Sequence, residues 1–168
     1  MTKQNLLTKN PMEINTSESN FATNKKKEAL DIFKSAPIPK EKDEEWRYTQ
    51  IEKLKLDNFE PFKSDGIVRA AALSEDLLEK GVILTDINAA LEKYQIARDH
   101  FFRNTKIDKD KFVALNAAHF SNGIFLYVPK NIEIDEPIKV DFSLEGQNSI
   151  IHNVIIVEPN SKVNFIEE

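Results

Sequence analysis

The feature that most constrains the fold is a change in hydrophobic periodicity at Gly123. Before that residue, apolar side chains recur every three to four positions, as on amphipathic helices. After it they alternate or form short runs rich in β-branched residues, as in strands. The sequence therefore predicts an α+β protein, with a predominantly helical N-terminal domain over residues 21–122 and a β-rich domain over 123–168. Strands are expected at Ile124–Val128, Ile132–Ile134, Ile138–Phe142, Ile150–Val157 and Val163–Ile166.

Two similar turns interrupt the β-rich domain about 30 residues apart, at Val128–Asn131 and Val157–Ser161. Each lies between an apolar strand and a second short strand, a spacing that suggests stacked coils of a repetitive β structure. Two copies are thin support for a repeat. Stacked coils bury their faces only against neighbours and need at least about three repeats, whereas the sequence stops at Glu168, just after a strand signal. We therefore expect the β domain to be incomplete and the chain to be a fragment.

The helical domain contains several segments with recognisable end signals. Asp43 is a plausible N-cap, with Glu44–Glu45 in a favourable first turn rather than acting as a catalytic pair. Thr85 or Asp86 caps a stronger helix further on. The Lys25–Lys27 run is expected to be a solvated helix face without a binding role. Helices are expected at Thr23–Ala36, Glu44–Leu54, Ser74–Lys80, Ile87–Ile96 and Asp110–Ser121, and short extended segments at Ile67–Arg69 and Val82–Leu84.

Composition excludes several classes of function. The formal net charge of -5 and a pI near 5.4 repel phosphate backbones, so no nucleic-acid partner is expected. The absence of cysteine excludes disulfides and the thiolate ligands that hold most iron–sulfur clusters. No apolar run approaches the roughly 20 residues of a membrane span, and the start lacks a secretory signal. We expect a cytoplasmic protein with no membrane contact, in which residues 1–20 form a disordered tail.

The sequence predicts no catalytic, cofactor-binding or metal-ligating residue. The four glycines are too scattered to form a phosphate-binding loop. His100, His119 and His152 are widely separated and do not match a zinc-hydrolase spacing. His119 lies on or beside an apolar helix face and is expected to be partly buried. His152 interrupts a strand-like run and is expected to be exposed or hydrogen-bonded to a neighbouring coil.

Four phrases between residues 37 and 168 carry a family resemblance. The most specific is Pro39 followed by Asp43–Thr49, which matches Pro-x-x-x-x-Glu-x-Trp-Arg-Tyr-Thr. The others are Phe112–Ala118 with Asn122–Lys130, then Glu136–Ile138, and finally Ile156–Glu158 with Phe165–Glu168. Together they resemble the N-terminal part of the SufB/SufD family of iron–sulfur cluster assembly proteins, and the Trp-Arg-Tyr-Thr phrase favours the SufD branch.

Two residues of these phrases depart mildly from the family pattern. Asn122 and Asn131 stand where the family usually has Asp and Gly. Both asparagines can adopt turn conformations, so the loop geometry is expected to survive.

The resemblance implies a fold and a role. The fold would be an N-terminal helical domain leading into the first coils of a right-handed parallel β-helix. In the family, SufD is a non-enzymatic scaffold of the SufBCD complex, pairing with SufB through β-helix surfaces and engaging the SufC ATPase through a C-terminal helical region. The complex builds transient iron–sulfur clusters. The resemblance places the SufC-binding region and the cluster-associated residues mainly outside this chain, which alone is expected to bind no cofactor.

Two alternatives remain open from the residues. One is a small-ligand-binding β module with a helical N-terminal domain, in which the strands enclose a pocket. The other is a metal-dependent hydrolase that brings the three histidines together with carboxylates. Large aromatic side chains can also line a pocket or an interface, although burial in the core is their more frequent fate. The aromatic candidates are Phe125, Tyr127 and Phe142 for the β pocket, and Trp46, Phe101 and Phe102 for a pocket or interface.

Overall fold

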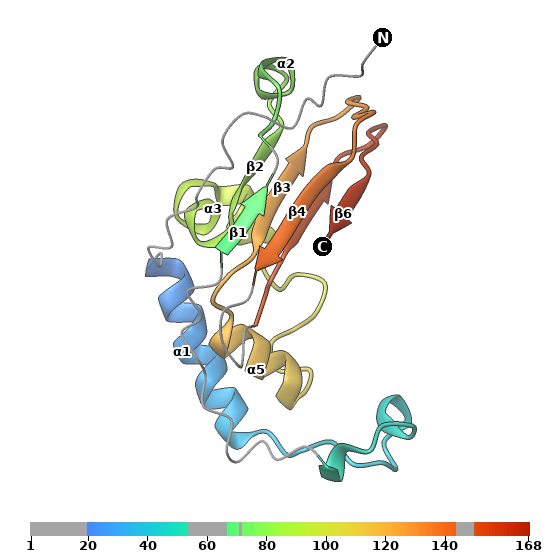
Figure 1. The fold of residues 1–168 in the computed structure, drawn as a ribbon. Coiled ribbons are helices and arrows are strands. Elements are labelled where there is room, and N and C mark those ends of the chain that lie inside the picture. The colour runs from blue at the N-terminus through green and yellow to red at the C-terminus, as the bar shows by residue number, and fades with distance from the viewer. Residues whose placement is uncertain (1–19, 54–66, 71, 144–149) are drawn as a thin grey trace.

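A computed structural model describes residues 20–53, 67–70, 72–143 and 150–168. Within these ranges the protein is an α+β structure, as predicted, in which the strands lie at one end and the paired helices α1 (Asn20–Ser35) and α5 (Lys111–His119) at the other (Figure 1). The predicted tail over residues 1–20 lies outside the described residues except for Asn20, which begins α1. None of the described helices combines the length and apolar character needed to cross a bilayer.

Small side chains allow α1 and α5 to approach closely. Ala29 of α1 is fully buried against Ala117 and Ala118 of α5. The Lys111 ammonium donates hydrogen bonds from Nζ to the carbonyl oxygens of Phe33 (2.6 Å) and Ala36 (3.0 Å). Because the last carbonyls of a helix have no partner within the helix, this lysine caps α1 and joins the two helices.

The expected helix over 44–54 is wrong. The chain there forms two single-turn 3-10 helices, η1 (Glu44–Trp46) and η2 (Ile51–Lys53). Asp43 does not cap forward into η1, because its carboxylate accepts a hydrogen bond from the Lys40 backbone N–H at 2.8 Å and closes the preceding turn. Local hydrogen bonding of an Asp side chain therefore competes successfully with helix capping at this position.

The expected helix over 87–96 is divided at Tyr94. It forms α3 (Ile87–Lys93) and α4 (Gln95–His100), and Tyr94 between them is extended, with φ −114° and ψ 123°. Of the two predicted N-cap candidates, Thr85 and Asp86, it is Asp86 that caps α3, accepting hydrogen bonds from the Asn88 and Ala89 N–H groups. At the break, Arg98 folds back and donates to the Leu91 carbonyl at 2.7 Å. The guanidinium supplies the donors that a continuing helix would have provided.

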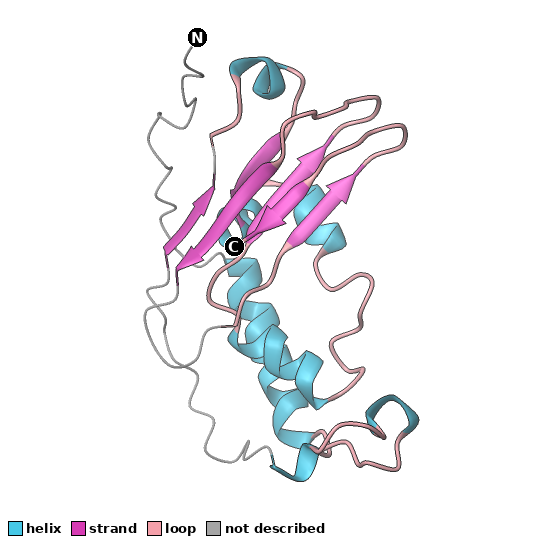
Figure 2. Ribbon diagram, turned by 45° about the vertical axis from the view of Figure 1, so that its right-hand side comes forward, coloured by secondary structure: helices cyan, strands magenta, loops and turns pink. Residues whose placement is uncertain are grey.

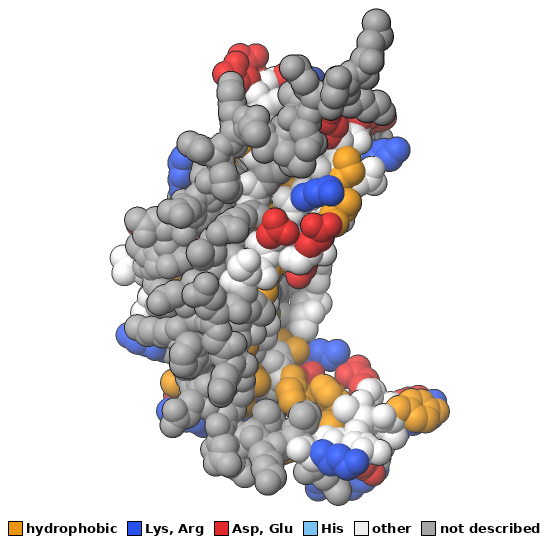
Figure 3. All heavy atoms as spheres, in the orientation of Figure 1, with side chains coloured by type: hydrophobic (Ala, Val, Ile, Leu, Met, Phe, Trp, Pro, Cys, Tyr) orange, Lys and Arg blue, Asp and Glu red, His pale blue; other side chains and the backbone are white. Residues whose placement is uncertain are grey.

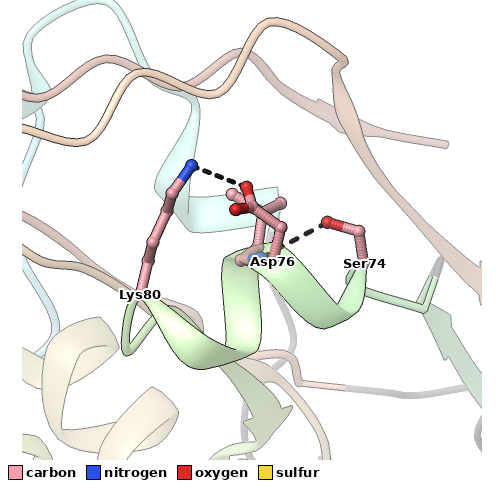
Figure 4. A network of polar contacts seen from close by, with 4 residues as sticks. Ser74, Asp76 and Lys80 are labelled. Carbon is pink, nitrogen blue, oxygen red and sulfur yellow. Dashed lines mark hydrogen bonds and ion pairs between the residues drawn. The ribbon is translucent and has the colours of Figure 1, made fainter.

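The short helix α2 (Glu75–Glu79) confirms the prediction for 74–80. Ser74 accepts a hydrogen bond from the Leu77 N–H at 3.4 Å, and Lys80 pairs with Asp76 at 2.6 Å across one helical turn (Figure 4). Gly81 follows at φ +84°, the left-handed conformation expected where a helix stops.

In the part of the chain that the structure describes, six strands form two three-stranded sheets (Figure 2). One sheet has the order β1-β4-β6 and the other β2-β3-β5. β3 pairs in parallel with β5, and β4 pairs in parallel with β6, whereas β1 and β2 are antiparallel to their neighbours. The strands are β1 (Ile67–Ala70), β2 (Ile83–Asp86), β3 (Ile124–Val128), β4 (Ile138–Ser143), β5 (Val154–Val157) and β6 (Phe165–Glu167).

The parallel pairs repeat at a nearly constant offset along the chain. Phe125 pairs with Val154, and Glu133 bridges Lys162, each 29 residues later; Ile138 pairs with Phe165, 27 residues later. The chain between Asn122 and Ser143 is therefore one layer, and the chain from Ile151 to Glu167 runs alongside it as a second layer. On the other side of the first layer, β1 and β2 pair with β4 and β3.

Two expected strands are shorter than predicted. The segment 132–134 contributes only the bridge at Glu133. The strand expected from residue 150 begins at Val154, because the Asn153 side chain, rather than a backbone carbonyl, accepts the hydrogen bond from the Ile124 N–H at 2.9 Å.

Strand β3, at the centre of sheet β2-β3-β5, is buried on both faces. Alternate residues of β3 point into an inter-sheet core formed by both sheets, while Phe125 points into a helix-side core under α3 and α4. The inter-sheet core comprises Ala70, Val82, Leu84, Ile124, Leu126, Val128, Ile134, Ile138 and Val140. The helix-side core comprises Ala22, Ile87, Ala90, Leu91, Ala97, Phe101, Phe120, Phe125 and Val154.

Candidate functional site

A pocket of about 570 Å³ lies where the helical part of the molecule meets β5. Its volume falls within the range typical of small-molecule sites, about 300–1,000 Å³. The outline of the molecule is hollowed between the strands and the limb formed by residues 36–53 (Figure 3). The pocket is lined by Trp46, His100, Phe102–Thr105, Asp110, Phe112, Val113, Asn116 and His152–Ile156.

One wall is formed by Trp46 of η1. Its ring stacks on Phe112 of α5, with centroids 4.8 Å apart and planes 29° from parallel. An ion pair between Lys109 and Glu45, with N and O 3.4 Å apart, lies in the adjoining segments. This wall brings together the Asp43–Thr49 and Phe112–Ala118 phrases of the family resemblance, which are more than 60 residues apart in the sequence. It also places Trp46, one of the aromatic candidates from the sequence, at the pocket.

The opposite wall contains His152, which is largely buried among aromatic rings. It stacks on Phe102, with centroids 4.2 Å apart and planes at 24°, and meets the edge of Phe101 at 4.9 Å. Burial lowers the pKa of His152 from 6.5 to about 4, so the ring is neutral at physiological pH. His152 was expected to be exposed or hydrogen-bonded to a neighbouring coil. Its backbone N–H does donate to Asn122 of the first layer, but its ring is largely buried and contacts Asn116 of helix α5.

The hydrogen bonds of Asn116 define the tautomer of His152. The Asn116 amide nitrogen donates to the Ile151 carbonyl at 3.3 Å, so its oxygen faces the His152 ring. That oxygen lies 3.0 Å from Nδ1. Nδ1 must therefore carry the proton, and Nε2 retains a lone pair that can accept a hydrogen bond. Sequence reasoning did not single out Asn116 as a site residue, although it lies in the Leu-Asn-x-Ala phrase.

Phe102 adopts a strained backbone conformation at this wall. Its φ is +53°, a region that costs a non-glycine residue roughly 1–2 kcal/mol. The conformation directs the ring onto His152 while its neighbour Phe101 enters the helix-side core. Strain of this kind is over-represented at functional sites, so it marks the pocket as a candidate site.

The three histidines do not converge. His100 lines the pocket, but its Nδ1 contacts the Ile96 carbonyl at 2.9 Å and its Nε2 accepts from Arg103 at 3.1 Å. His119 meets the edge of the Phe33 ring on the α1 side of α5, and burial followed by the charge of Lys26 lowers its pKa. Among the described residues, no group of three or more His, Cys, Asp or Glu side chains is arranged to hold a metal ion.

The aromatic residues expected to line a β pocket are also separated. Phe125 and Tyr127 pack in the helix-side core, and Phe142 packs against the inter-sheet core on the other face. Trp46 and Phe102 line the pocket described above, whereas Phe101 is buried. The candidate ligand site therefore lies beside β5, at the helical part of the molecule, and not between the two sheets.

The fold and site define an α+β protein in which a helical segment packs against two parallel layers of strands, with an aromatic pocket at the junction. Residues 55–140 match the family described as the SufBD protein N-terminal region. The chain belongs to this SufBD family.

Curated relatives agree with this assignment. The chain is 30% identical over 182 aligned positions to the iron–sulfur cluster assembly protein SufD of Bacillus subtilis (strain 168), an alignment that covers 89% of the chain and 41% of that protein. It is 35% identical over 98 positions to an iron–sulfur cluster assembly SufBD family protein of Staphylococcus epidermidis (strain ATCC 12228), covering 56% of the chain and 21% of that protein. The chain therefore spans less than half the length of these relatives.

Proposed function

We propose that this chain is the N-terminal region of a SufD-type, non-catalytic scaffold subunit for iron–sulfur cluster assembly. Membership of the SufBD family and the similarity to Bacillus subtilis SufD support this role. By the same resemblance, the proposed partners are SufB and SufC, the proposed location is the cytoplasm, and the iron–sulfur cluster is a transient product of the complex. No catalytic or cofactor-binding residue is assigned to residues 1–168.

The observation that carries the proposal is the 27–29-residue offset between the two parallel layers. We interpret these layers as the first two coils of a right-handed parallel β-helix. The second layer repeats the apolar pattern of the first, but its apolar side chains are exposed to solvent. Leu126 is fully buried, whereas Ile155 at the equivalent position is 42% exposed. Val128 and Val157 differ in the same way, with Val157 43% exposed. A further coil stacked on β5 would bury both.

The backbone of β5 supports the same interpretation. The N–H of His152 donates to Asn122, and the N–H of Glu158 donates to Val128. Parallel strands bond to one neighbour through alternate residues, so Ile155 and Val157 direct their backbone groups away from β3. These groups form a strand edge of the kind that pairs with an added strand.

A chimera tests the scaffold role directly. Residues 1–168 would replace the aligned part of Bacillus subtilis SufD in a strain that lacks SufD, and the activity of an iron–sulfur enzyme would be measured. We expect the chimera to restore activity. A chimera that accumulates as a folded protein at the wild-type level but restores no activity would contradict the proposed role.

Copurification tests whether the proposed SufC contact lies outside residues 1–168. Tagged residues 1–168 and full-length Bacillus subtilis SufD would each be coexpressed with SufB and SufC. We expect the full-length protein to retain both partners and residues 1–168 to lose SufC. Retention of SufC by residues 1–168 would place that contact in the N-terminal region and overturn this part of the proposal.

The pocket favours a second candidate function, the binding of a small planar ligand. Its aromatic walls and the Nε2 atom of His152, which has no hydrogen-bond partner among the described residues, suit a ring that carries a hydrogen-bond donor. Trp46 is the single tryptophan of the chain, so its fluorescence reports binding without a label. A library of ring compounds would be screened for saturable quenching of this fluorescence. A compound whose affinity falls at least tenfold in the His152→Phe variant would support this function. The absence of saturable quenching would exclude it for the compounds tested.

A further inference from the structure

Tyr48 is the most exposed large apolar side chain that the structure describes. Its ring is 87% exposed, and the Arg47 guanidinium covers one face of it, 4.7 Å from the ring centroid. Both residues belong to the limb formed by residues 36–53, which projects from the helical end of the molecule (Figure 1). Tyrosine and arginine are enriched among the residues that carry most of the binding energy at protein interfaces. The limb therefore has the composition of a docking element.

The ring of Tyr48 does not occupy the aromatic pocket of its own chain. Trp46, two residues earlier, lines that pocket and stacks on Phe112 of α5. Tyr48 is not among the lining residues and faces solvent instead. Turning Tyr48 into the same pocket would break the stack that holds the limb against α5. A pocket for this ring must therefore be supplied by another molecule.

The pocket offers the contacts that a tyrosine side chain requires. Its walls include the rings of Trp46, Phe102 and Phe112, and aromatic rings pack favourably in stacked or edge-to-face pairs. His152 adds an acceptor, because Nδ1 faces Asn116 and Nε2 has no hydrogen-bond partner among the described residues. A phenol combines an aromatic ring with an O–H donor, so it matches both features of the pocket.

Tyr48 is the tyrosine of this chain that is available to fill such a pocket. The other two, Tyr94 and Tyr127, pack against the helix-side core. We propose that two copies of the chain form a dimer in which Tyr48 of each copy inserts into the aromatic pocket of the other. There its hydroxyl donates to the Nε2 atom of His152. The same surface serves both copies, as in other dimers with two-fold symmetry. The inference rests on the pocket being a binding site, which is the second candidate function above.

Charge complementarity favours a second copy as the occupant. Segment 41–45 of the limb contains four acidic residues and one lysine, whereas loop 103–109, part of which lines the pocket, contains three basic residues and one aspartate. Within one copy the two segments already meet in the Glu45–Lys109 ion pair, with N and O 3.4 Å apart. The other acidic residues of the segment and the other basic residues of the loop are exposed.

Insertion of Tyr48 would bring the acidic segment of one copy beside the basic loop of the other, because the ring follows that segment by three residues. Pairing between exposed opposite charges of this kind orients two partners and speeds their encounter more than it adds affinity. The ring would therefore supply most of the binding energy, and the charges would select the orientation.

Sedimentation equilibrium tests the dimer. The Ile155→Lys chain is the parent protein, because this change blocks the separate association expected at the β5 edge. We expect a monomer–dimer equilibrium that Tyr48→Ala weakens by about tenfold or more. Tyr48→Phe keeps the ring but loses the donor, so its dimer should have an intermediate affinity. Leu78→Ala is the matched control and should leave the equilibrium unchanged. Leu78 is 56% exposed on α2, at the opposite end of the molecule from the limb (Figure 1).

A mixing experiment tests whether the contact is made between copies. Tyr48→Ala lacks the ring but keeps an open pocket. Thr105→Trp keeps the ring but fills its own pocket from an exposed position in the lining. Neither variant can make the contact with itself, whereas a mixed pair can make it once. We expect mixed dimers that are tighter than the dimers of either variant alone.

Three results would overturn the inference. One is a parent chain that stays monomeric up to about 1 mM. Another is a dimer that Tyr48→Ala weakens no more than Leu78→Ala does. The third is a mixture of the two variants that associates no better than each alone. The chimera and ring-compound experiments do not require a dimer, so a monomeric chain that still binds ring compounds would end this inference and keep the candidate ligand function.

Discussion

At Gly123 the backbones of the two layers of strands approach closely. The φ of Gly123 is +153°, and a Cβ atom there would lie 1.9 Å from the carbonyl oxygen of His152. No side chain fits at that distance, so the first layer depends on glycine for the second layer to lie beside it. The carbonyl oxygen of Gly123 also accepts from the Ile87 N–H, so the same residue contacts both the second layer and the start of α3.

We predict that Gly123→Ala destabilises the protein by about 3 kcal/mol or more, because the methyl group forces backbone apart as well as straining φ. Urea unfolding followed by circular dichroism measures this free energy. Gly81→Ala is the matched control: its φ is +84°, but its Cβ would meet only Pro129, at an ordinary 3.5 Å. In the control variant the free energy of unfolding should fall by about 1–2 kcal/mol. Equal losses in the two variants would contradict the close-approach argument.

His152 predicts a dependence of stability on pH. The unfolded histidine binds a proton below about 6.5, whereas the folded one, with its pKa lowered to about 4 by burial, does not. The unfolded state therefore binds more protons between these values, so the free energy of unfolding should fall as pH drops from 6.5 to 4. His152→Phe should flatten this slope, leaving the smaller part due to His119. Equal slopes of unfolding free energy against pH in the two proteins would contradict the lowered pKa of His152.

Among the helices, the break at Tyr94 depends on a single side chain. Arg98 donates to the carbonyls of Leu91 (2.7 Å) and Glu92 (2.9 Å), both in the last turn of α3. Hydrogen bonds from a charged donor contribute about 1.5–3 kcal/mol, reduced here because the Glu92 contact is exposed to solvent.

We predict that Arg98→Met lowers the free energy of unfolding by about 1–2 kcal/mol and leaves the α3–α4 break more mobile. Unfolding curves and amide exchange at Leu91–Tyr94 measure the two effects. Arg103→Met serves as control, since Arg103 is exposed and, among the described residues, its guanidinium hydrogen-bonds only to the His100 ring. If both variants unfold at the same urea concentration, Arg98 does not hold the break.

The elements that could be predicted from sequence are those fixed by local pattern. Ile124–Val128 is one such element, because its apolar run is bounded by turn residues on both sides. The break at Tyr94 could not be predicted, because it is accompanied by a contact in which the Arg98 side chain reaches back seven residues to the Leu91 carbonyl. The helix expected around Trp46 failed for a related reason: Asp43 turned backwards to Lys40, and Trp46 is held by Phe112 from a distant helix.

The candidate site shows the same limit. Trp46 and Phe102 were recognisable as aromatic residues that can line a pocket, but their wall partners were not. His152 and Asn116 are 36 residues apart and meet only because the second layer places His152 beside α5. No periodicity or spacing signals such a contact, and the strained φ of Phe102 has no signature in the sequence.

For the molecule as a whole, the difference between the two layers determines where substitutions are tolerated. Leu126 and Ile155 occupy equivalent positions, yet only Leu126 is fully buried. A fully buried Leu→Ala change typically costs about 2–5 kcal/mol.

We predict that Leu126→Ala lowers the free energy of unfolding by an amount in that range. Ile155→Ala should lower it by only about 1 kcal/mol, because the Ile155 side chain already contacts solvent. Urea unfolding measures both. Ile155→Lys should in addition reduce self-association through the β5 edge, detected by light scattering, since edge lysines oppose strand pairing. A loss at Ile155 equal to that at Leu126 would mean that the second layer is as well covered as the first.

The antiparallel strands β1 and β2 have a consequence for the order of folding during synthesis. They precede β3 and β4 in the chain and occupy the outer side of the first layer. When β3 and β4 emerge from the ribosome, their antiparallel partners have already been made, so pairing on that side does not wait for a later segment. The second layer then adds β5 and β6 on the other side, and each sheet therefore grows in one direction.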